Sequence, residues 1–160
     1  MEFSKAISLR RSIRKFKPDA ISGEKLEKLR EAIRTAPTAN NNQPFKFIFI
    51  TDAVIRRDLV AKACHQPDLA EAPLIVVPCC ENDKAFDVAI AVDHLILAAT
   101  DAGLGSCWVG WIEREEIKSL LNIPQDRDVP VIIPIGYADE APEARPRKPL
   151  NEIILKNTYS

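Results

Sequence analysis

The sequence lacks an excess of charge of either sign. Its 22 basic and 23 acidic residues give a formal net charge of -1, so the chain as a whole has no field that would attract nucleic acid or an anionic membrane. Its first residues, Met1–Lys5, lack the apolar stretch of a signal peptide, and no apolar run is long enough to span a bilayer. These absences predict a cytoplasmic protein that binds neither nucleic acid nor membranes, and in which any anion site is local.

Motifs for a dinucleotide fold, a metal site and a disulfide are also missing. No G-x-G-x-x-G follows an expected strand, so a Rossmann site has no support. The cysteines are Cys64, Cys79, Cys80 and Cys107, and the histidines are His65 and His94. Because they show no C-x-x-C and no metal-ligand spacing, we expect buried, reduced thiols and no metal. A vicinal disulfide between Cys79 and Cys80 is disfavoured in a reducing cytosol.

What is present is enough for one core. With 160 residues and 46% hydrophobic content, the chain is expected to form a single domain, 1–160. Periodicity and capping residues predict helices in the N-terminal segment before Pro18, after Ser22, and over 53–63, 83–102 and 113–121. Strands are expected over 45–51, 74–79, 106–111 and 129–137, the last pushed to an edge or a bulge by Pro130 and Pro134. Interleaved helices and strands favour a three-layer α/β or α+β arrangement.

The helix expected over 83–102 is apolar on most of its faces. It contains no proline or glycine, and a helix of this kind belongs either in the core or at a subunit interface. A proline-rich, extended tail is expected from Pro142 to Pro149, followed by a last apolar piece, 150–155.

The first cluster with chemical potential is Arg10-Arg11-Ser12-Ile13-Arg14. As a helix, it would place three guanidinium groups and a hydroxyl within about one and a half turns. Guanidinium groups grip phosphate oxygens in pairs and stay charged at every working pH. A cluster of this kind standing alone is more often a solvated basic face. A second group, Arg145, Arg147 and Lys148, is compatible with one anion held from two sides, although spacing cannot bring the two groups together.

Two further segments suit a flat heterocycle. The loop 37–44 (P-T-A-N-N-N-Q-P) offers amide side chains and exposed backbone, and the segment 103–110 (G-L-G-S-C-W-V-G) would let backbone approach a planar ligand at Gly110. Each also has an ordinary reading, as an asparagine-rich turn and as a helix end followed by a strand. None of these signals is specific alone.

Taken together and in order, these segments resemble the FMN-dependent nitroreductase family. Its members pair R-R-S-x-R-x-F, here Arg10–Phe16, with P-S-x-x-N-x-Q-P-(aromatic), here Pro37–Phe45. The similarity continues through 87–91, 103–108, the strand ending at 136–137, and 145–150. The resemblance implies an α+β fold, a three-layer α/β/α sandwich with a mostly antiparallel central sheet. It also implies an intertwined homodimer with FMN at the subunit interface.

The resemblance carries cofactor roles to particular residues. Arg10, Arg11, Ser12 and Arg14 correspond to the residues that bind the phosphate and ribityl chain, and Arg145 and Arg147 approach the phosphate from the tail. Pro37, Thr38, Ala39, Asn41 and Gln43 correspond to the loop that the partner subunit lays against the isoalloxazine, Gln43 bracing it. Trp108, Val109 and Gly110 correspond to the segment facing flavin N5 and O4, and Gln66 is a candidate for flavin O2. His65 is expected to be a surface histidine.

The implied activity is electron transfer from NAD(P)H to a small organic acceptor, such as a nitroaromatic or a quinone, in a ping-pong mechanism. The hydride chemistry belongs to the flavin, so no catalytic side chain is required. The lid-like insertion of many relatives is absent, which leaves substrate selection open. Alternatives are a reductive dehalogenase or flavin-fragmenting enzyme of the same fold, a flavin-storage protein without turnover, and a basic-patch nucleic-acid binder.

Overall fold

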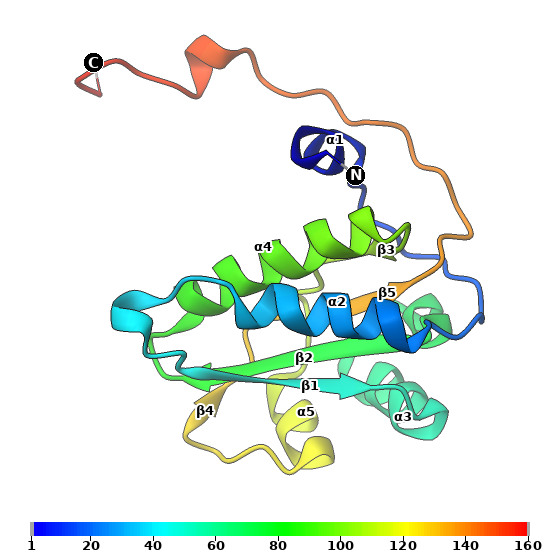
Figure 1. Ribbon diagram of the computed structural model, residues 1–160. Helices are drawn as coiled ribbons and strands as arrows, with labels where there is room; N and C mark the ends of the chain where they lie inside the picture. Colours follow the sequence, from blue (N-terminus) through cyan, green and yellow to red (C-terminus); the bar gives the residue numbers. More distant parts are fainter. Residues whose placement is uncertain (1, 160) are drawn as a thin grey trace.

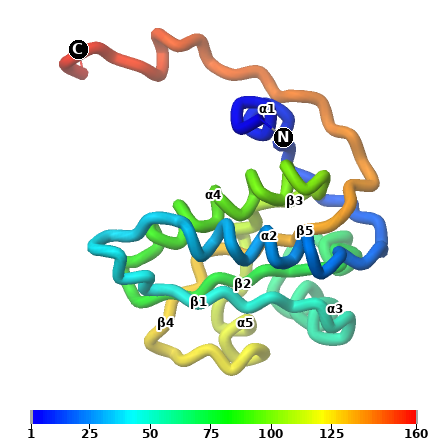
Figure 2. Tube along the Cα trace, viewed as in Figure 1, coloured from blue at the N-terminus to red at the C-terminus, as the bar shows by residue number. Residues whose placement is uncertain are grey.

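A five-stranded antiparallel sheet forms the middle of the molecule in the computed structural model, which describes residues 2–159. The strands are β1 (Phe45–Ile50), β2 (Leu74–Glu81), β3 (Gly105–Ser106), β4 (Arg127–Asp128) and β5 (Ile133–Gly136). Their order is β1-β2-β5-β3, and the short β4 pairs with the end of β2. Figures 1 and 2 show this sheet running between two layers of helices.

Helices cover both faces of the sheet. One face carries α2 (Gly23–Arg34) and α4 (Ala85–Asp101), and the other carries α3 (Ala53–Ala63) and α5 (Arg114–Leu121). The short α1 (Phe3–Leu9) packs beyond α4, and 3₁₀ turns lie at Ala39–Asn41, Pro67–Glu71 and Leu150–Glu152. The predicted three-layer α+β sandwich with an antiparallel sheet is confirmed.

The central strand β2 divides the core in two. Its side chains alternate between the layers, so Ile75 and Val77 pack with α3 and α5, whereas Leu74 and Val76 pack with α2 and α4. All four are fully buried, as expected for a strand covered on both faces. The same alternation sends the thiols of Cys79 and Cys80 to opposite faces, which excludes a bond between them.

Local chemistry accounts for the helix starts. The Ser22 hydroxyl accepts the Lys25 N–H at the beginning of α2, as predicted, and the Asp52 carboxylate accepts two N–H groups at the beginning of α3. Those two hydrogen bonds lower the pKa of Asp52. The bounds of α3 are those predicted from the sequence.

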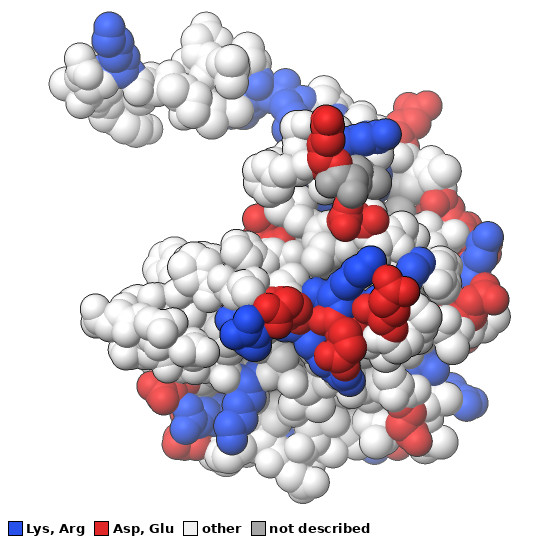
Figure 3. Space-filling view, in the orientation of Figure 1, with Lys and Arg blue, Asp and Glu red and all other residues white. Residues whose placement is uncertain are grey.

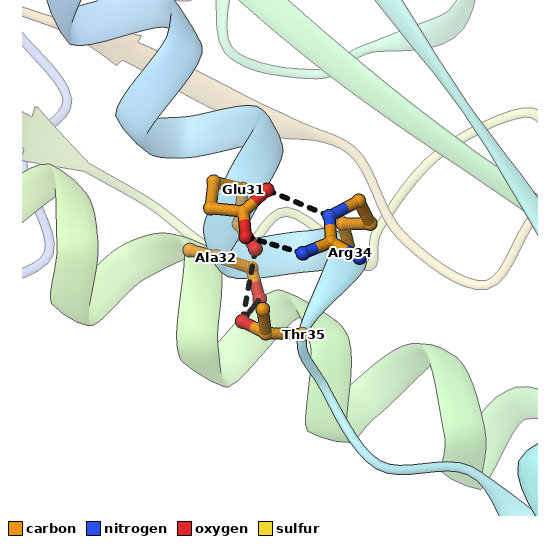
Figure 4. A network of polar contacts seen from close by, with 4 residues as sticks. All are labelled: Glu31, Ala32, Arg34 and Thr35. Atoms are coloured by element: carbon orange, nitrogen blue, oxygen red, sulfur yellow. Dashed lines mark hydrogen bonds and ion pairs between the residues drawn. The ribbon is translucent and has the colours of Figure 1, made fainter.

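The outer face of α2 carries paired charges. Arg34 donates to both carboxylate oxygens of Glu31, at 2.7 and 2.6 Å, and the Thr35 hydroxyl bonds back to the last turn (Figure 4). The guanidinium lowers the pKa of Glu31. Figure 3 shows acidic and basic side chains interleaved over this face, so α2 presents a solvated surface without a field of one sign.

Of the edge or bulge expected for the last strand, the edge position is wrong. β5 lies between β2 and β3, with Pro134 opposite Ile75. The carbonyl of Pro134 accepts the Cys107 N–H, so the proline nitrogen faces the side of β3, which ends at Ser106. The missing N–H of Pro134 therefore faces Cys107, where β3 has ended as a continuous ladder and single bridges follow. The strand expected over 106–111 is correspondingly short, and beyond β3 the chain forms single bridges, between Val109 and Ile132 and between Ile112 and Cys64.

Several apolar side chains remain on the surface of the chain. Phe86 of α4 is 87% exposed and Leu150 of the tail is 78% exposed, and Ile153, Ile154 and Leu155 are exposed as well. The tail is extended from Pro142 to Pro149, as predicted, and runs past α1 away from the sheet (Figure 1). None of the helices in residues 2–159 is long and apolar enough to cross a membrane.

Candidate functional site

The arginine segment is extended, which corrects the helical arrangement expected for it. α1 ends at Leu9, and Ser12 forms a parallel bridge with Ser106 of β3. The Ile13 N–H donates to the Ser106 carbonyl at 2.9 Å, and the Ile13 side chain is buried against Gly105. Pairing with β3 satisfies the backbone and buries Ile13, so it replaces a last helical turn. Because neighbouring side chains of an extended segment point to opposite sides, Arg14 is exposed beside the buried Ile13.

The N-terminal segment is joined to the start of the C-terminal tail. Phe16 and Ala138 form an antiparallel bridge, and the Lys17 N–H donates to the Tyr137 carbonyl at 2.8 Å. The carboxylate of Glu140 accepts the N–H groups of Arg14 and Lys15, the latter at 3.1 Å. Glu140 was not among the residues predicted from the sequence, and nothing local to it signals a partner so distant along the chain. It places the tail beside the arginines.

Both basic groups consequently meet at one cavity of about 350 Å³. It is lined by Ile7, Ser8, Arg10, Arg11, Ser12, Arg14, Pro142, Glu143, Ala144, Arg145 and Arg147. The lining thus contains five guanidinium groups and one carboxylate. Spacing along the sequence left this convergence undecided, and the fold produces it. Lys148, in contrast, lies 3.9 Å from Glu152 and does not line the cavity.

The five arginines differ in what their guanidinium groups contact. Arg11 donates to the carbonyls of Ser8 and Arg10, at 2.8 and 2.9 Å, and Arg147 donates to the carbonyl of Arg145 at 3.1 Å. Within residues 2–159, the guanidinium groups of the other three make no hydrogen bond or ion pair. They are Arg10, Arg14 and Arg145. Three unpaired, permanently charged guanidinium groups around one cavity suit a phosphate.

Below the arginines lies a buried thiol. Burial raises the pKa of Cys107, and this effect outweighs the opposing influence of Arg14 and of a hydrogen bond with Ser12. Cys107 is 3% exposed and free. A thiol that is buried and neutral is a poor nucleophile, so Cys107 acts as a packing group of the core.

The asparagine-rich loop lies away from the arginines of its own chain. It follows the C-terminal end of α2, a helix of 12 residues and so about 18 Å long, whereas the arginine segment leads to its N-terminal end. Asn40 and Asn41 have φ values of 51° and 56°, in the left-handed region that asparagine tolerates. Pro37, Thr38, Ala39, Asn41 and Gln43 do not line the arginine cavity.

Hydrogen bonds that involve side chains fix the conformation of this loop. The Gln43 N–H donates to the Thr38 hydroxyl at 3.0 Å, and the Gln43 side chain donates to the Asn41 carbonyl at 3.1 Å. The Ala39 N–H donates at 3.0 Å to the carboxylate of Asp87, a nearly buried residue in the first turn of α4. Sequence reasoning gave Asp87 no such role. The available signal was weak, because Asp87 is one of three carboxylates in this mostly apolar helix, with Asp93 and Asp101.

The segment 108–111 combines a fixed backbone with open space. Val109 is buried and exchanges two 3.0 Å hydrogen bonds with Ile132. At Gly110, in contrast, an added Cβ would meet no heavy atom within 4 Å. Packing within residues 2–159 therefore does not require glycine there. Trp108 is partly exposed, and Gln66 begins the turn at Pro67–Glu71 without capping it.

A bridge brings the predicted Gln66 region close to this segment. Cys64 pairs with Ile112, and the Glu113 N–H donates to the Ala63 carbonyl at 3.0 Å. His65 is exposed, as expected, but it is not isolated: its ring stacks on Trp111 at 4.3 Å between centroids, and its Nε2 lies 3.1 Å from the Glu113 carboxylate.

Comparison with known proteins places this site in context. The family model described as "Putative TM nitroreductase" matches residues 2–160. A relative from Archaeoglobus fulgidus, described as "Putative NADH dehydrogenase/NAD(P)H nitroreductase", is 32% identical over 148 residues, covering 85% of each chain. An iodotyrosine deiodinase from Thermotoga neapolitana is 26% identical, covering 94% of this chain and 95% of the relative. The solved structure of an FMN-dependent nitroreductase from Clostridium difficile R20291 is 29% identical, with a TM-score of 0.86, covering 96% and 98% of the two chains.

Proposed function

The chain belongs to the nitroreductase family, and on that premise we propose that it binds FMN and passes electrons from NAD(P)H to an organic acceptor such as a nitroaromatic or a quinone. The observation that carries this proposal is the cavity where Arg10, Arg14 and Arg145 converge without partners of their own. The Clostridium difficile relative is named an FMN-dependent nitroreductase. The names of other relatives, an NADPH-flavin oxidoreductase and an NADPH-dependent FMN reductase, support a nicotinamide donor.

The residues present fit the phosphate end of FMN. A phosphate carries up to two negative charges, and three unpaired guanidinium groups at the cavity offer more donors than its oxygens can accept. The Ser12 hydroxyl lines the same cavity and would fill a remaining oxygen. Since arginine stays charged throughout the working pH range, this grip would be independent of pH. Bound flavin would supply the redox chemistry, for which the chain has no side chain of its own.

The ring would then lie along the segment that ends at Gly110. The open space over Gly110 admits a planar group close to the backbone, and the bonds between Val109 and Ile132 hold that backbone in place. The task of these residues is to orient the ring and leave one of its faces accessible to donor and acceptor in turn. No side chain has to form a covalent bond with the substrate.

A second copy of the chain would complete the site. The loop 37–44 is preformed by its bonds to Asp87 and within itself, yet it lies outside the arginine cavity of its own chain. Phe86 on α4 and Leu150 on the tail are exposed and apolar, which is costly for a lone chain. We therefore include in the proposal a homodimer in the cytoplasm, in which the loop of one copy covers the flavin held by the other.

The test is spectroscopic. The purified protein, loaded with FMN, should show a flavin absorption band and elute as a dimer, and the band should bleach when NADH or NADPH is added without oxygen. Addition of a quinone should then restore it. A protein that takes up no FMN, or whose flavin never bleaches with either nucleotide, would contradict the proposal.

The second candidate is reductive dehalogenation, favoured by the deiodinase relative, whose length this chain covers almost completely. It predicts release of halide from an iodinated phenol by the reduced protein. Measuring the rate of iodide release and the rate of quinone consumption with the same preparation decides between the two activities.

A further inference from the structure

Trp111 has a position that the family resemblance does not explain. It is 71% exposed, although tryptophan is large and mostly apolar. Its backbone is nonetheless held on both sides: Val109 is bonded to Ile132, and Ile112 is bridged to Cys64. A side chain that is exposed on a fixed backbone is available to a ligand without rearrangement of the fold.

The indole is also supported by a neighbour. The His65 ring stacks on it at 4.3 Å with an angle of 29° between the planes, and His65 is itself held by Glu113 at 3.1 Å. Stacking on one face leaves the tryptophan largely exposed, so the imidazole steadies the indole without covering it. A ring that is ordered in advance loses less side-chain entropy when a ligand binds.

The sequence places this platform one residue after Gly110. Consecutive Cα atoms lie about 3.8 Å apart, so a flavin ring seated over Gly110 would have Trp111 at its border. We propose that Trp111, supported by His65, is a stacking platform that selects planar aromatic acceptors over acceptors without a ring. This inference rests on the proposed flavin site and adds a determinant of substrate class. The physical basis is the attraction between offset or edge-to-face aromatic rings, which aliphatic or inorganic acceptors lack.

The first experiment measures binding without turnover. Isothermal titration of the FMN-loaded protein with naphthalene-2-carboxylate and with hexanoate compares two redox-inert carboxylates, one with a ring system and one without. We expect tighter binding of the naphthalene compound, and Trp111→Ala should weaken it by about three- to tenfold while leaving hexanoate unchanged. Trp111→Phe should retain most of the affinity, and His65→Ala should lose part of it.

The second experiment measures turnover with a naphthoquinone and with ferricyanide. Trp111→Ala should raise KM for the quinone without changing KM for ferricyanide. Glu24→Gln, on the exposed face of α2, is the control and should change neither KM. Equal effects on both acceptors, no effect on either, or a dimer that dissociates on Trp111→Ala would overturn the platform. Loss of bleaching in the unsubstituted protein would instead refute the proposed function.

Discussion

Replacing Arg10 and Arg14 together by alanine tests the phosphate site most directly. A hydrogen bond to a charged group contributes about 1.5 to 3 kcal/mol, so two such contacts sum to roughly 3 to 6 kcal/mol if they act independently. At about 1.4 kcal/mol per factor of ten, FMN should bind roughly 100- to 10,000-fold more weakly. Neither guanidinium has a partner within residues 2–159, so no intramolecular bond is lost. The free energy of unfolding of the apoprotein should change by less than about 0.5 kcal/mol.

The assay is titration of the apoprotein with FMN, followed by flavin fluorescence, together with urea unfolding. A matched control is Arg30→Ala with Arg34→Ala, which removes the same charge from the outer face of α2, where Arg34 is paired with Glu31 (Figure 4) and Arg30 with Glu27. Exposed pairs of this kind contribute only about 0.2 to 1 kcal/mol, so FMN affinity should stay at the level of the unsubstituted protein. Equal loss of FMN affinity in both double variants, or full retention of FMN by Arg10→Ala with Arg14→Ala, would contradict the phosphate site.

Three further perturbations test the framework around the site. Asp87→Ala removes the acceptor of the Ala39 N–H and should lower the free energy of unfolding by about 1 to 3 kcal/mol, measured by urea titration, with faster proteolysis of the loop. Gly136→Ala would bring a Cβ to 2.4 Å from the Pro73 ring; a loss of about 1 to 3 kcal/mol in thermal unfolding is expected, and an unchanged melting temperature would contradict that contact. Burial raises the pKa values of Cys64 and Cys80 to about 11, so these thiols ionise first in the unfolded protein, and the free energy of unfolding should fall as pH rises from about 8.5 toward 11. Cys64→Ala should remove part of that slope.

The helices and strands follow largely from local chemistry. Ser22 caps α2, Asp52 begins α3, and aromatic and β-branched residues form β1, because these preferences act between neighbours in the chain. Most of the boundaries could be read from such signals. β5 could not, since a proline in a strand indicates an edge only when the neighbouring strand continues past it, and here β3 ends first.

The arrangement of the arginines depended on contacts that no local signal contains. The pattern Arg10-Arg11-Ser12-Ile13-Arg14 is compatible with a helix, but pairing with β3 makes it extended. Glu140 meets the Arg14 backbone across 126 residues of sequence. The role of Asp87 likewise arises from a loop 48 residues earlier.

The sequence alone therefore determined which residue types were available. These are two groups of arginines near the two ends of the chain, an amide-rich loop, and a glycine before a tryptophan. The tertiary structure decided which of them share a cavity, which guanidinium groups stay unpaired, and which ring supports Trp111. The physical reason is that the formation of a binding site depends on long-range backbone pairing, whose geometry is set by the whole sheet and not by the residues that it brings together.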